Sequence, residues 1–340
     1  MIAVAARTSM LRVAIVGAGR IGHLHAGNAA KHPRMKIVSV YDVDRGRAVS
    51  LAAHYDARAV DRVEEALSLA DAAIVASSTD THAETALVVA RAGKPMYLEK
   101  PIDLDFEKAR ATAAALKELG VQVVIGFNRR FDAAYGRLRA DIRQGALGRL
   151  QILHMTSRGP NEAPSRDYIA HCGGIYRDKA IHFFDLLRYL TGREVVEVFA
   201  QGATHADAFI GEMGDVDTCV VQLRLDDNSL CQIDNTRRAI YGFDERIEVM
   251  GTQGLREVGR GRSDTAFADE RGVFGALLPS GFAQRFEAAF ANAIDGFARY
   301  VLDGEGNVPT VDDGIAAQVI SEAAATSARE ARAVRIGTAT

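Results

Sequence analysis

The sequence predicts an α/β chain with two domains: a doubly wound parallel sheet at the N-terminus, and then an α+β domain with a large, mostly antiparallel open sheet. Three observations support this prediction. The chain has 340 residues, which is more than one ordinary core accommodates. Short apolar runs alternate with helical patterns in the first third. Longer strands of alternating polarity follow in the second half.

The first domain is expected to span residues 1–126, with residues 1–10 frayed. Helical patterns occupy residues 20–31, 44–54, 82–92 and 104–119. Between them, apolar runs predict strands over residues 11–16, 36–41, 72–76, 96–98 and 121–125. This succession is typical of parallel sheets, in which a helix connects each strand to the next. The first ten residues lack the long apolar stretch of a signal peptide.

The second domain is expected to span residues 127–340 and to bind substrate and mediate oligomerisation. Helices are predicted over residues 132–144, 173–190, 283–302 and 313–332. Strands are predicted over residues 150–158, 195–202, 218–225, 230–237, 245–250 and 255–258. Asp227-Asn228 and Gln253-Gly254 separate paired runs as hairpin turns do. Because the boundary has no flexible linker, we expect the domains to pack tightly with a cleft between them.

Composition excludes several classes of function. Hydrophobic residues make up 48% and charged residues 25% of the chain, the balance of a globular protein. The formal net charge of -3 predicts neither a nucleic-acid partner nor an anionic membrane surface. Cys172, Cys219 and Cys231 form no CxxC pair, so we interpret them as small buried side chains in a cytoplasmic protein without a metal site.

A glycine motif predicts dinucleotide binding. Gly17, Gly19 and Gly22, with Arg20 and Ile21 before the last, fit GxGxxG. The motif directly follows a strand and opens a helix, which is the context of a Rossmann fold. The first glycine permits the tight turn, the second lets the pyrophosphate approach, and the third allows close helix packing. A glycine-rich turn without a ligand is the weaker alternative.

Asp42 predicts that the dinucleotide is NAD. It ends the second strand, twenty residues after the last glycine of the motif. A carboxylate there accepts hydrogen bonds from ribose hydroxyls and repels a 2′-phosphate. Arg45 and Arg47 lie just beyond it and could weaken this preference, although we favour their assignment to a solvated helix face.

The segment after residues 72–76 is expected to line the nicotinamide side of the cofactor, through Ser77, Ser78, Thr79 and His82. Ligands of open α/β sheets lie beyond the carboxyl ends of the strands. Thr79 or the following Asp80 is also a candidate N-cap for the helix near residue 82.

Glu99 and Lys100 follow the next strand and are expected to reach the same edge of the sheet. Pro101 directs Lys100 toward an extended conformation. A charged pair directly after an apolar strand is not typical of a core. An ordinary surface ion pair is the alternative, and the position after the strand favours a functional role.

Residues 171–185 contain the strongest chemical cluster. Asp178 and His182 are four residues apart, so a helix would place them on one face, which Asp185 would continue. A histidine titrates near neutral pH and suits removal of a hydroxyl proton, while a neighbouring carboxylate holds its tautomer. A lysine ammonium would favour the developing alkoxide. A simple helix pair and a metal site are the alternatives, and no further matching ligand motif favours metal.

These motifs together resemble the glucose–fructose oxidoreductase/inositol dehydrogenase (Gfo/Idh/MocA) family. The resemblance rests on the glycine motif, on Glu99-Lys100-Pro101 and on the GGxxxDxxxHxxD run over residues 173–185, and it extends from residue 11 to the last helix. It implies that Lys100, Asp178 and His182 form the catalytic set, with His182 as the acid/base. It also implies a C-terminal sheet that mediates dimer or tetramer contacts.

Within the family, residues 126–132, 156–160 and 173–185 are most similar to inositol 2-dehydrogenases. This likeness implies that Asn128, Arg129, Ser157 and Tyr241 face the substrate. Lys179 departs from the pattern, because inositol enzymes usually carry threonine or methionine after the catalytic aspartate. A second ammonium there would suit a different polyol, an aldose or an acidic sugar.

We therefore expect an NAD+-dependent dehydrogenase that oxidises a secondary alcohol of a cyclic polyol to a ketone. An aldose or other sugar dehydrogenase tolerant of NADP is the first alternative. A non-catalytic NAD(H)-binding regulatory protein is an alternative of another class, because fold alone does not decide function. Lys100, Asp178 and His182 argue against the regulator, since cofactor binding needs none of them. We also expect a homo-oligomer, with a tetramer favoured, built through the sheet of residues 195–258.

Overall fold

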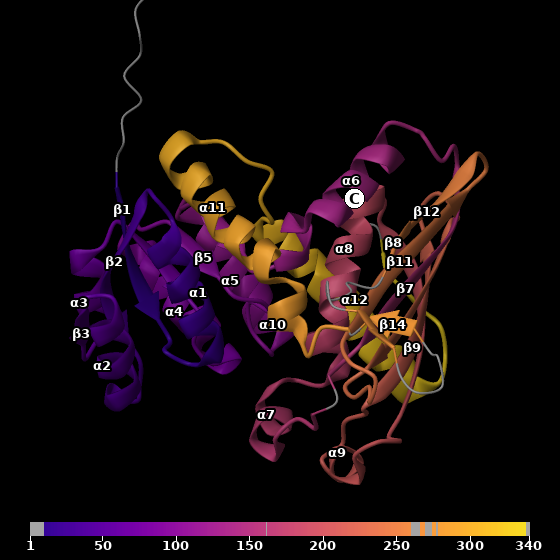
Figure 1. Cartoon of the computed structure of the whole chain (residues 1–340), viewed down its shortest axis with the longest axis horizontal. Helices are drawn as coiled ribbons and strands as arrows, with labels where there is room; N and C mark the ends of the chain where they lie inside the picture. The colour runs from indigo at the N-terminus through magenta and orange to yellow at the C-terminus, as the bar shows by residue number, and fades with distance from the viewer. Residues whose placement is uncertain (1–9, 161, 260–265, 269–273, 277, 338–340) are drawn as a thin grey trace, which may run out of the picture. The chain divides into compact units, whose positions relative to one another are not determined.

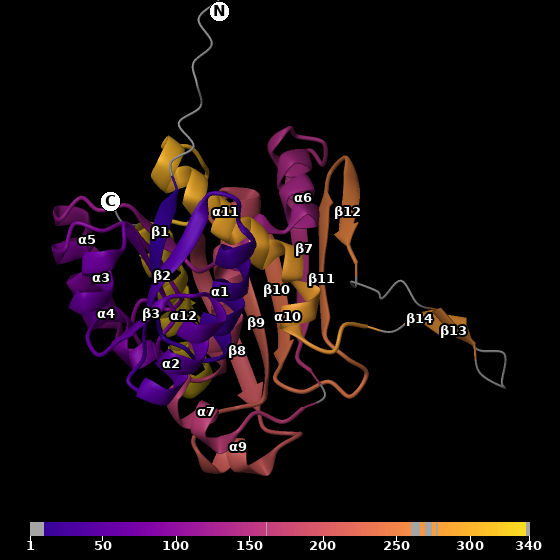
Figure 2. The same cartoon turned by 60° about the vertical axis from the view of Figure 1, so that its left-hand side comes forward.

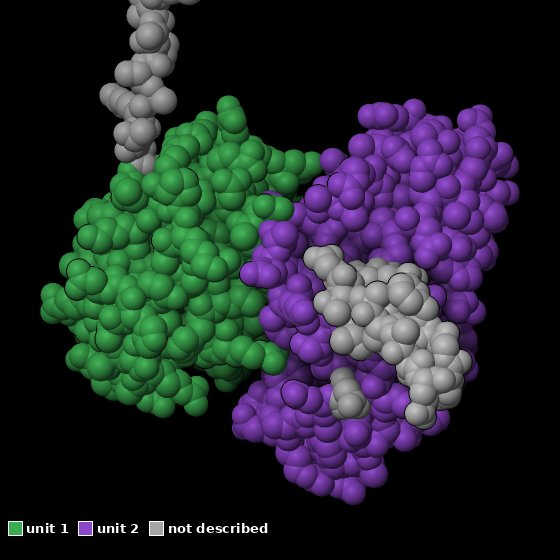
Figure 3. Space-filling model, viewed as in Figure 1, with its two compact units in different colours: residues 1–128, 290–315 green, residues 129–289, 316–340 purple. Residues whose placement is uncertain are grey.

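The computed structural model describes residues 10–160, 162–259, 266–268, 274–276 and 278–337. Fraying was predicted for residues 1–10, and residues 1–9 of that range lie outside the described residues. The chain divides into two compact units, coloured separately in Figure 3. Unit 1 contains residues 1–128 and 290–315, and unit 2 contains residues 129–289 and 316–340.

Unit 1 is built on a six-stranded parallel sheet with the strand order β3-β2-β1-β4-β5-β6. This order confirms the predicted doubly wound sheet. The central strands are buried along their whole length, which explains their continuous apolar sequences. The strands are β1 (Leu11–Val16), β2 (Met35–Tyr41), β3 (Arg58–Val60), β4 (Ala72–Val75), β5 (Met96–Leu98) and β6 (Val123–Ile125).

Helices lie on both faces of this sheet. Helices α1 and α2 lie on one face, and α3, α4 and α5 lie on the other, as Figure 2 shows. Strand β3 and helix α3 were not predicted, because three and seven residues are too few to reveal a period. The helices are α1 (Arg20–Lys31), α2 (Arg45–His54), α3 (Val63–Leu69), α4 (His82–Arg91) and α5 (Phe106–Glu118).

Unit 2 is built on a seven-stranded sheet with the strand order β12-β11-β7-β10-β9-β8-β15. Strands β7 and β10 pair in parallel and the other pairs are antiparallel, which confirms the predicted sheet. The strands are β7 (Leu150–Arg158), β8 (Val195–Ala203), β9 (Thr218–Leu225), β10 (Leu230–Thr236), β11 (Asp244–Gly251), β12 (Gly254–Val258) and β15 (Val334–Arg335), with a separate hairpin of β13 (Ala266–Ala268) and β14 (Phe274–Ala276).

The two faces of this sheet differ. Helices α6 (Ala133–Arg143) and α8 (Ile181–Thr191) run along the inner face, as Figure 1 shows, and pack against each other. On the outer face, the strand registers align four apolar side chains in one row across β12, β11, β7 and β10. These are Leu255, Met250, Ile152 and Leu230, and all except the half-buried Ile152 are exposed.

Two predicted helices are interrupted, and both interruptions have a structural cause. The helix predicted over residues 283–302 divides at Phe286, whose buried ring packs against Tyr135 and Phe243. The first part of the helix predicted over residues 173–190 is a π-helical turn. The remaining elements are α7 (Arg166–His171), η3 (the π turn, Tyr176–Ala180), α9 (Ala208–Glu212), α10 (Phe282–Arg285), α11 (Glu287–Asp303), α12 (Val311–Glu330), and the 3-10 turns η1 (Thr79–Thr81) and η2 (Asn128–Phe131).

The predicted turns and cysteines agree with the structure in most respects. Asp227-Asn228 connects β9 to β10, with Asn228 at a φ of 66°. The β11–β12 hairpin turns through Thr252-Gln253, one residue earlier than expected, because Gly254 already pairs with Gly251. All three cysteines are free and buried, as predicted.

Candidate active site

The glycine motif forms the turn between β1 and α1. Gly17 has a φ of 102°, and a Cβ there would lie 2.5 Å from the backbone of Ala76 and Ser77. A Cβ at Gly22 would lie 1.9 Å from the Gly17 carbonyl oxygen. Gly19 caps α1, and a Cβ there would meet no heavy atom within 4 Å. Gly19 therefore leaves space beside the N-terminus of α1, where a pyrophosphate would approach the helix.

Asp42 is held beside this turn at the end of β2. Its Oδ2 accepts the Ala18 N–H at 2.6 Å, and its Oδ1 accepts the Asp44 N–H at 2.8 Å. The Gly17 N–H is bonded to the Tyr41 carbonyl, which ties the glycine turn to the same strand. The structure thus places a half-buried carboxylate beside the glycine turn, and its contact with the ribose stays a prediction.

The segment after β4 is organised by His82. Its Nδ1 lies 2.8 Å from the Pro101 carbonyl oxygen and its Nε2 lies 3.1 Å from the Ser77 carbonyl oxygen. Burial lowers the pKa of His82, so the neutral ring donates to one carbonyl at a time. His82 thereby connects the Ser77 segment to the turn after Lys100.

The expected N-cap role of Thr79 or Asp80 is wrong. Both residues lie in η1, and α4 starts after Thr81, which makes no side-chain cap hydrogen bond. The Thr81 hydroxyl instead contacts the Ser77 hydroxyl at 2.8 Å. The 3-10 turn moves the helix start beyond both candidates, and leaves Ser78 exposed and Thr79 half-buried.

Glu99 is buried beneath Lys100. Its Oε1 accepts a hydrogen bond from His25 Nε2 at 2.7 Å, and its Oε2 accepts the Lys100 N–H at 3.2 Å. Burial alone would raise the pKa of Glu99, but the hydrogen bond from His25 together with the charges of His25, Lys100 and His82 lowers the pKa below its ordinary value. A Cβ at Gly126 would lie 2.8 Å from this carboxylate. Lys100 itself is half-buried and precedes a cis peptide bond to Pro101.

In unit 2, Asp178 lies in the π turn η3 and His182 in the first turn of α8. The predicted α-helical spacing of the two residues is therefore wrong, because a π turn is wider than an α-helical turn. The Asp178 carboxylate accepts hydrogen bonds from the Tyr168 hydroxyl and from Arg237 Nη1, the latter at 3.1 Å. Two donors on one oxygen favour the ionised form of this carboxylate.

Asp185 does not continue the chemical face as predicted. It is 1% exposed and forms two-pronged hydrogen bonds with the Arg130 guanidinium, the shortest at 2.6 Å. A buried aspartate with such a partner belongs to the core of unit 2. Among the described residues, no group of three or more His, Cys, Asp or Glu side chains is placed to hold a metal ion.

Lys179 lies between two ion-pair clusters. Its Nζ donates to the Thr236 carbonyl oxygen at 2.6 Å and lies 2.8 Å from where a Cβ of Gly159 would stand. Burial lowers the pKa of Lys179 to about 7, with Glu245 opposing that effect and Arg237 adding to it. The side chain is therefore a titratable amine near neutral pH.

Ser157 and Arg129 converge on Glu245. The Arg129 guanidinium donates from Nε and Nη2 to the two Glu245 oxygens, each at 2.9 Å, and Ser157 Oγ lies 3.3 Å from Oε2. Tyr135 donates its hydroxyl to the same carboxylate at 3.1 Å. All four residues are buried, so this carboxylate fixes the position of both predicted substrate residues.

The other two residues of this prediction differ in exposure. Asn128 is 2% exposed and is the last residue of the first segment of unit 1. Tyr241 is 46% exposed, and its hydroxyl donates to Asp244 at 3.1 Å and accepts from Arg158 at 3.2 Å. The structure thus groups Ser157 and Arg129 and leaves Tyr241 at the surface of unit 2.

Sequence reasoning missed Glu245, Arg237, Asp215 and His25. A signal for two of them exists in the strand alternation. Glu245 shares the inward phase of β11 with Ile247 and Val249, and Arg237 follows the inward phase of β10. A charged residue in phase with buried apolar residues indicates a buried ion pair.

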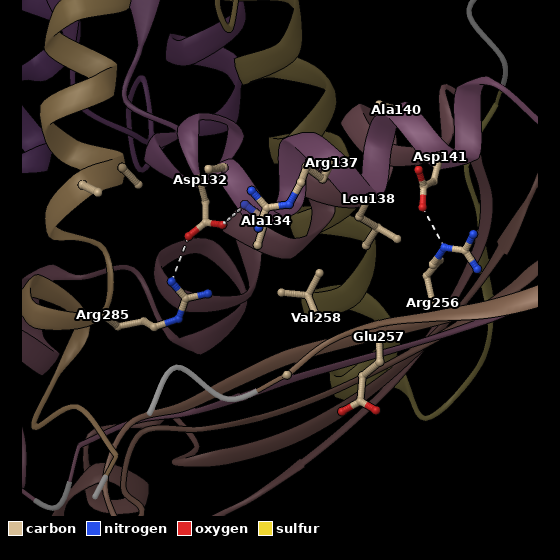
Figure 4. A pocket seen from close by; sticks show the side chains of 14 residues that line it. Asp132, Ala134, Arg137, Leu138, Ala140, Asp141, Arg256, Glu257, Val258 and Arg285 are labelled. Atoms are coloured by element: carbon tan, nitrogen blue, oxygen red, sulfur yellow. Dashed lines mark hydrogen bonds and ion pairs between the residues drawn. The ribbon is translucent and has the colours of Figure 1, made fainter. Parts of the chain in front are cut away.

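Unit 2 also contains a hollow away from these residues. It measures about 770 Å³ and lies between α6, β12 and the segment around Arg285 (Figure 4). Two ion pairs line it, Arg285 with Asp132 and Arg256 with Asp141. None of the predicted substrate residues lines it, so it does not locate the substrate.

The described helices include none that is both long and apolar enough to span a bilayer. Two family models cover most of the chain. Residues 11–127 match the oxidoreductase family with an NAD-binding Rossmann fold, and residues 135–256 match the GFO/IDH/MocA C-terminal domain. These matches agree with the observed parallel sheet and with the glycine turn at its edge.

Known relatives match at nearly full length. The chain is 37% identical to an inositol 2-dehydrogenase of Rhizobium meliloti, covering 96% of this chain and 99% of that one. It is 36% identical to a myo-inositol 2-dehydrogenase of Thermotoga maritima, covering 96% and 98%. A solved structure titled as a putative myo-inositol dehydrogenase from Sinorhizobium meliloti superposes with a TM-score of 0.92 at 36% identity, covering 96% and 100%.

The predicted family, enzyme class and cofactor are confirmed by these matches. The residue-level assignments of the site stay predictions. The chain is a member of the GFO/IDH/MocA family of NAD-dependent oxidoreductases.

Proposed function

We propose that the chain oxidises a secondary alcohol of an inositol-like cyclic polyol to a ketone with NAD+. The observation that carries this proposal is the identity of 36–37%, over nearly the full length of both chains, to two enzymes named for inositol oxidation. A relative at this identity could act on a different substrate class through changes in a few side chains of the site. Lys179 is the candidate for one such change.

The proposed chemistry divides among three side chains. Bound NAD+ supplies the hydride acceptor. Lys100 donates a hydrogen bond to the alcohol oxygen and favours its developing negative charge. His182 takes the hydroxyl proton, and Asp178 holds the imidazole and stabilises its charged form. The hydrogen bonds from Tyr168 and Arg237 support this role for Asp178, because they keep it a carboxylate.

Substrate contacts are assigned to Asn128, Arg129, Ser157, Lys179 and Tyr241. The Glu245 carboxylate supports two of these assignments, because it fixes Arg129 and Ser157 in one place. A polyol carries only hydroxyl groups, which fit a set of donors and acceptors whose charges are already paired.

A sugar acid is the second candidate substrate. The observation that favours it is Lys179, whose amine titrates near neutral pH and would charge beside a substrate carboxylate. For a neutral polyol the same amine serves as a hydrogen-bond partner.

The decisive experiment is a screen of NADH formation with inositol isomers, aldoses and sugar acids, each with NAD+ and NADP+. We expect the highest kcat/KM for an inositol with NAD+. A sugar acid as the best substrate would contradict the polyol assignment. A kcat/KM with NADP+ at or above that with NAD+ would contradict the role of Asp42, and Asp42→Ala should narrow the gap between the two cofactors.

Assembly and location are also proposed. The row of Leu255, Met250, Ile152 and Leu230 on the outer sheet face supports a homotetramer formed through sheet faces. Light scattering should give a multiple of the 36.6 kDa chain mass, and Leu230→Glu should lower it. A monomer at micromolar concentration would contradict this. Three free, buried cysteines support a cytoplasmic location.

A further inference from the structure

Arg237 lies at the centre of a buried charge cluster in unit 2. It directly follows β10, and its side chain is 4% exposed. Nη1 donates to Asp178 Oδ2 at 3.1 Å, and Nη2 donates to Asp215 Oδ2 at 3.0 Å and to Cys172 Sγ at 3.3 Å. The two terminal nitrogens of one guanidinium therefore join two carboxylates that are 37 positions apart in sequence.

Both carboxylates act on one turn. Asp215 Oδ1 accepts the Ile175 N–H at 3.0 Å, immediately before the π turn, and Asp178 lies within that turn. The backbone of Arg237 is itself fixed, since its N–H donates to the Asp217 carbonyl at 2.7 Å. The cluster thus connects the end of β10 to the segment that carries Asp178.

Arg237 is the cation that donates to both carboxylates, while Lys179 acts electrostatically on Asp178 and Arg177 on Asp215. One guanidinium faces two carboxylates, whose side chains are only 14% and 12% exposed. Burial alone would lower the pKa of Arg237, and Asp178, Cys172 and Asp215 raise it, so the side chain stays charged. A lysine at this position could not reproduce the contacts, because an ammonium lacks the planar fork that reaches two carboxylates at once.

We infer that Arg237 is a positioning residue for the reaction: it orients the Asp178 carboxylate and sets how strongly that carboxylate stabilises a protonated His182. This inference rests on the proposed function, which pairs Asp178 with His182. Arg237 neutralises part of the negative charge of Asp178. Without Arg237, the Asp178 carboxylate would stabilise the His182 imidazolium more strongly. Without Asp215, the Arg237 guanidinium would pair mainly with Asp178 and neutralise more of its charge.

The test is the pKa of His182, measured by NMR titration of the full-length protein with 13C-labelled histidine and no substrate. His182→Gln assigns the signal among the nine histidines. We expect Arg237→Met to raise the pKa of His182 by about one pH unit, and Asp215→Asn to lower it. Arg237→Lys should give a smaller increase. Arg238→Met is the matched control, because Arg238 pairs with Asp207 outside the cluster, and it should leave the pKa unchanged.

Asp178→Asn separates the inference from the proposed function. In that background, Arg237→Met should no longer raise the pKa of His182. If Asp178→Asn changes the pKa of His182 while Arg237→Met and Asp215→Asn do not, the inference about Arg237 is wrong and the proposed pair stands. If Asp178→Asn itself leaves the pKa unchanged, the proposed pair is wrong. Should Arg237→Met fail to fold, Asp215→Asn decides by the sign of its effect.

In turnover, Arg237→Met should lower kcat by roughly a hundredfold, the scale of a misplaced catalytic group. The acid limb of its pH profile should shift to higher pH, because His182 must be neutral to accept the proton. A purely structural role would scale the whole profile down without moving it, and that result would overturn the inference.

Discussion

The two units fix most of their functional side chains in different ways, although Glu99 of unit 1 is held by the His25 side chain. In unit 1, backbone groups hold Asp42 and His82, through N–H donors in one case and carbonyl oxygens in the other. In unit 2, charged side chains hold one another, as Arg129 holds Glu245 and Arg237 holds Asp178. A backbone-held site depends on local chain geometry. A side-chain-held site depends on partners distant in sequence, so one substitution there leaves a buried charge without its partner.

The largest effect that would sharpen this contrast concerns the buried pair of Arg130 and Asp185. Their side chains are 6% and 1% exposed. Asp185→Asn should lower the free energy of unfolding by about 3–5 kcal/mol, because it leaves a buried guanidinium uncompensated. Denaturant unfolding measures this change. The control is Lys117→Met, which breaks an exposed pair with Asp312 in unit 1 and should cost under about 1 kcal/mol. Equal losses of unfolding free energy in Asp185→Asn and Lys117→Met would contradict this difference between the two pairs.

The next effect concerns the backbone geometry of unit 1. Gly19→Ala has room for its methyl group at a φ of -78°, so stability should fall by under about 1 kcal/mol. The affinity for NAD+ should nevertheless fall by about tenfold or more, equal to 1.4 kcal/mol, because the methyl group obstructs the pyrophosphate. Calorimetric titration with NAD+ measures the affinity. Gly22→Ala is the comparison, and its steric conflict with Gly17 should reduce stability and affinity together. Unchanged affinity in Gly19→Ala would count against the cofactor turn.

The features that the sequence predicted also differ between local and distant contacts along the chain. The glycine turn, Asp42 and the parallel strands depend on residues close together in the chain, and these were predicted correctly as structure. The Arg237–Asp215 and Arg129–Glu245 pairs join residues 22 and 116 positions apart, and no local pattern indicates which charged residues meet. The π turn at residues 176–180 was also missed, because its sequence fits an α-helix and tertiary contacts from Asp215 and Arg237 shape it.

Another expected effect is the pH dependence that Lys179 confers on stability. Its pKa in the folded protein is about 7, against an ordinary value of 10.5. Between these values the unfolded chain binds more protons, so stability rises with pH, and the cost of burying the amine is fully present below about pH 7. Lys179→Met should remove this rise. Unfolding by denaturant from neutral pH upward measures it, and parallel pH curves for the two proteins would mean that the amine is not buried in solution.

The central claim is that His182 is the acid/base of a polyol dehydrogenase, and His182→Ala tests it most directly. On the best polyol of the screen, kcat should fall by roughly a hundred- to ten-thousand-fold. Binding of NADH, followed by its fluorescence, should stay near that of the wild type, because the glycine turn and Asp42 hold the cofactor. His54→Ala, which changes an exposed histidine at the end of α2, should leave both quantities unchanged. A His182→Ala enzyme that keeps most of its turnover would contradict the account.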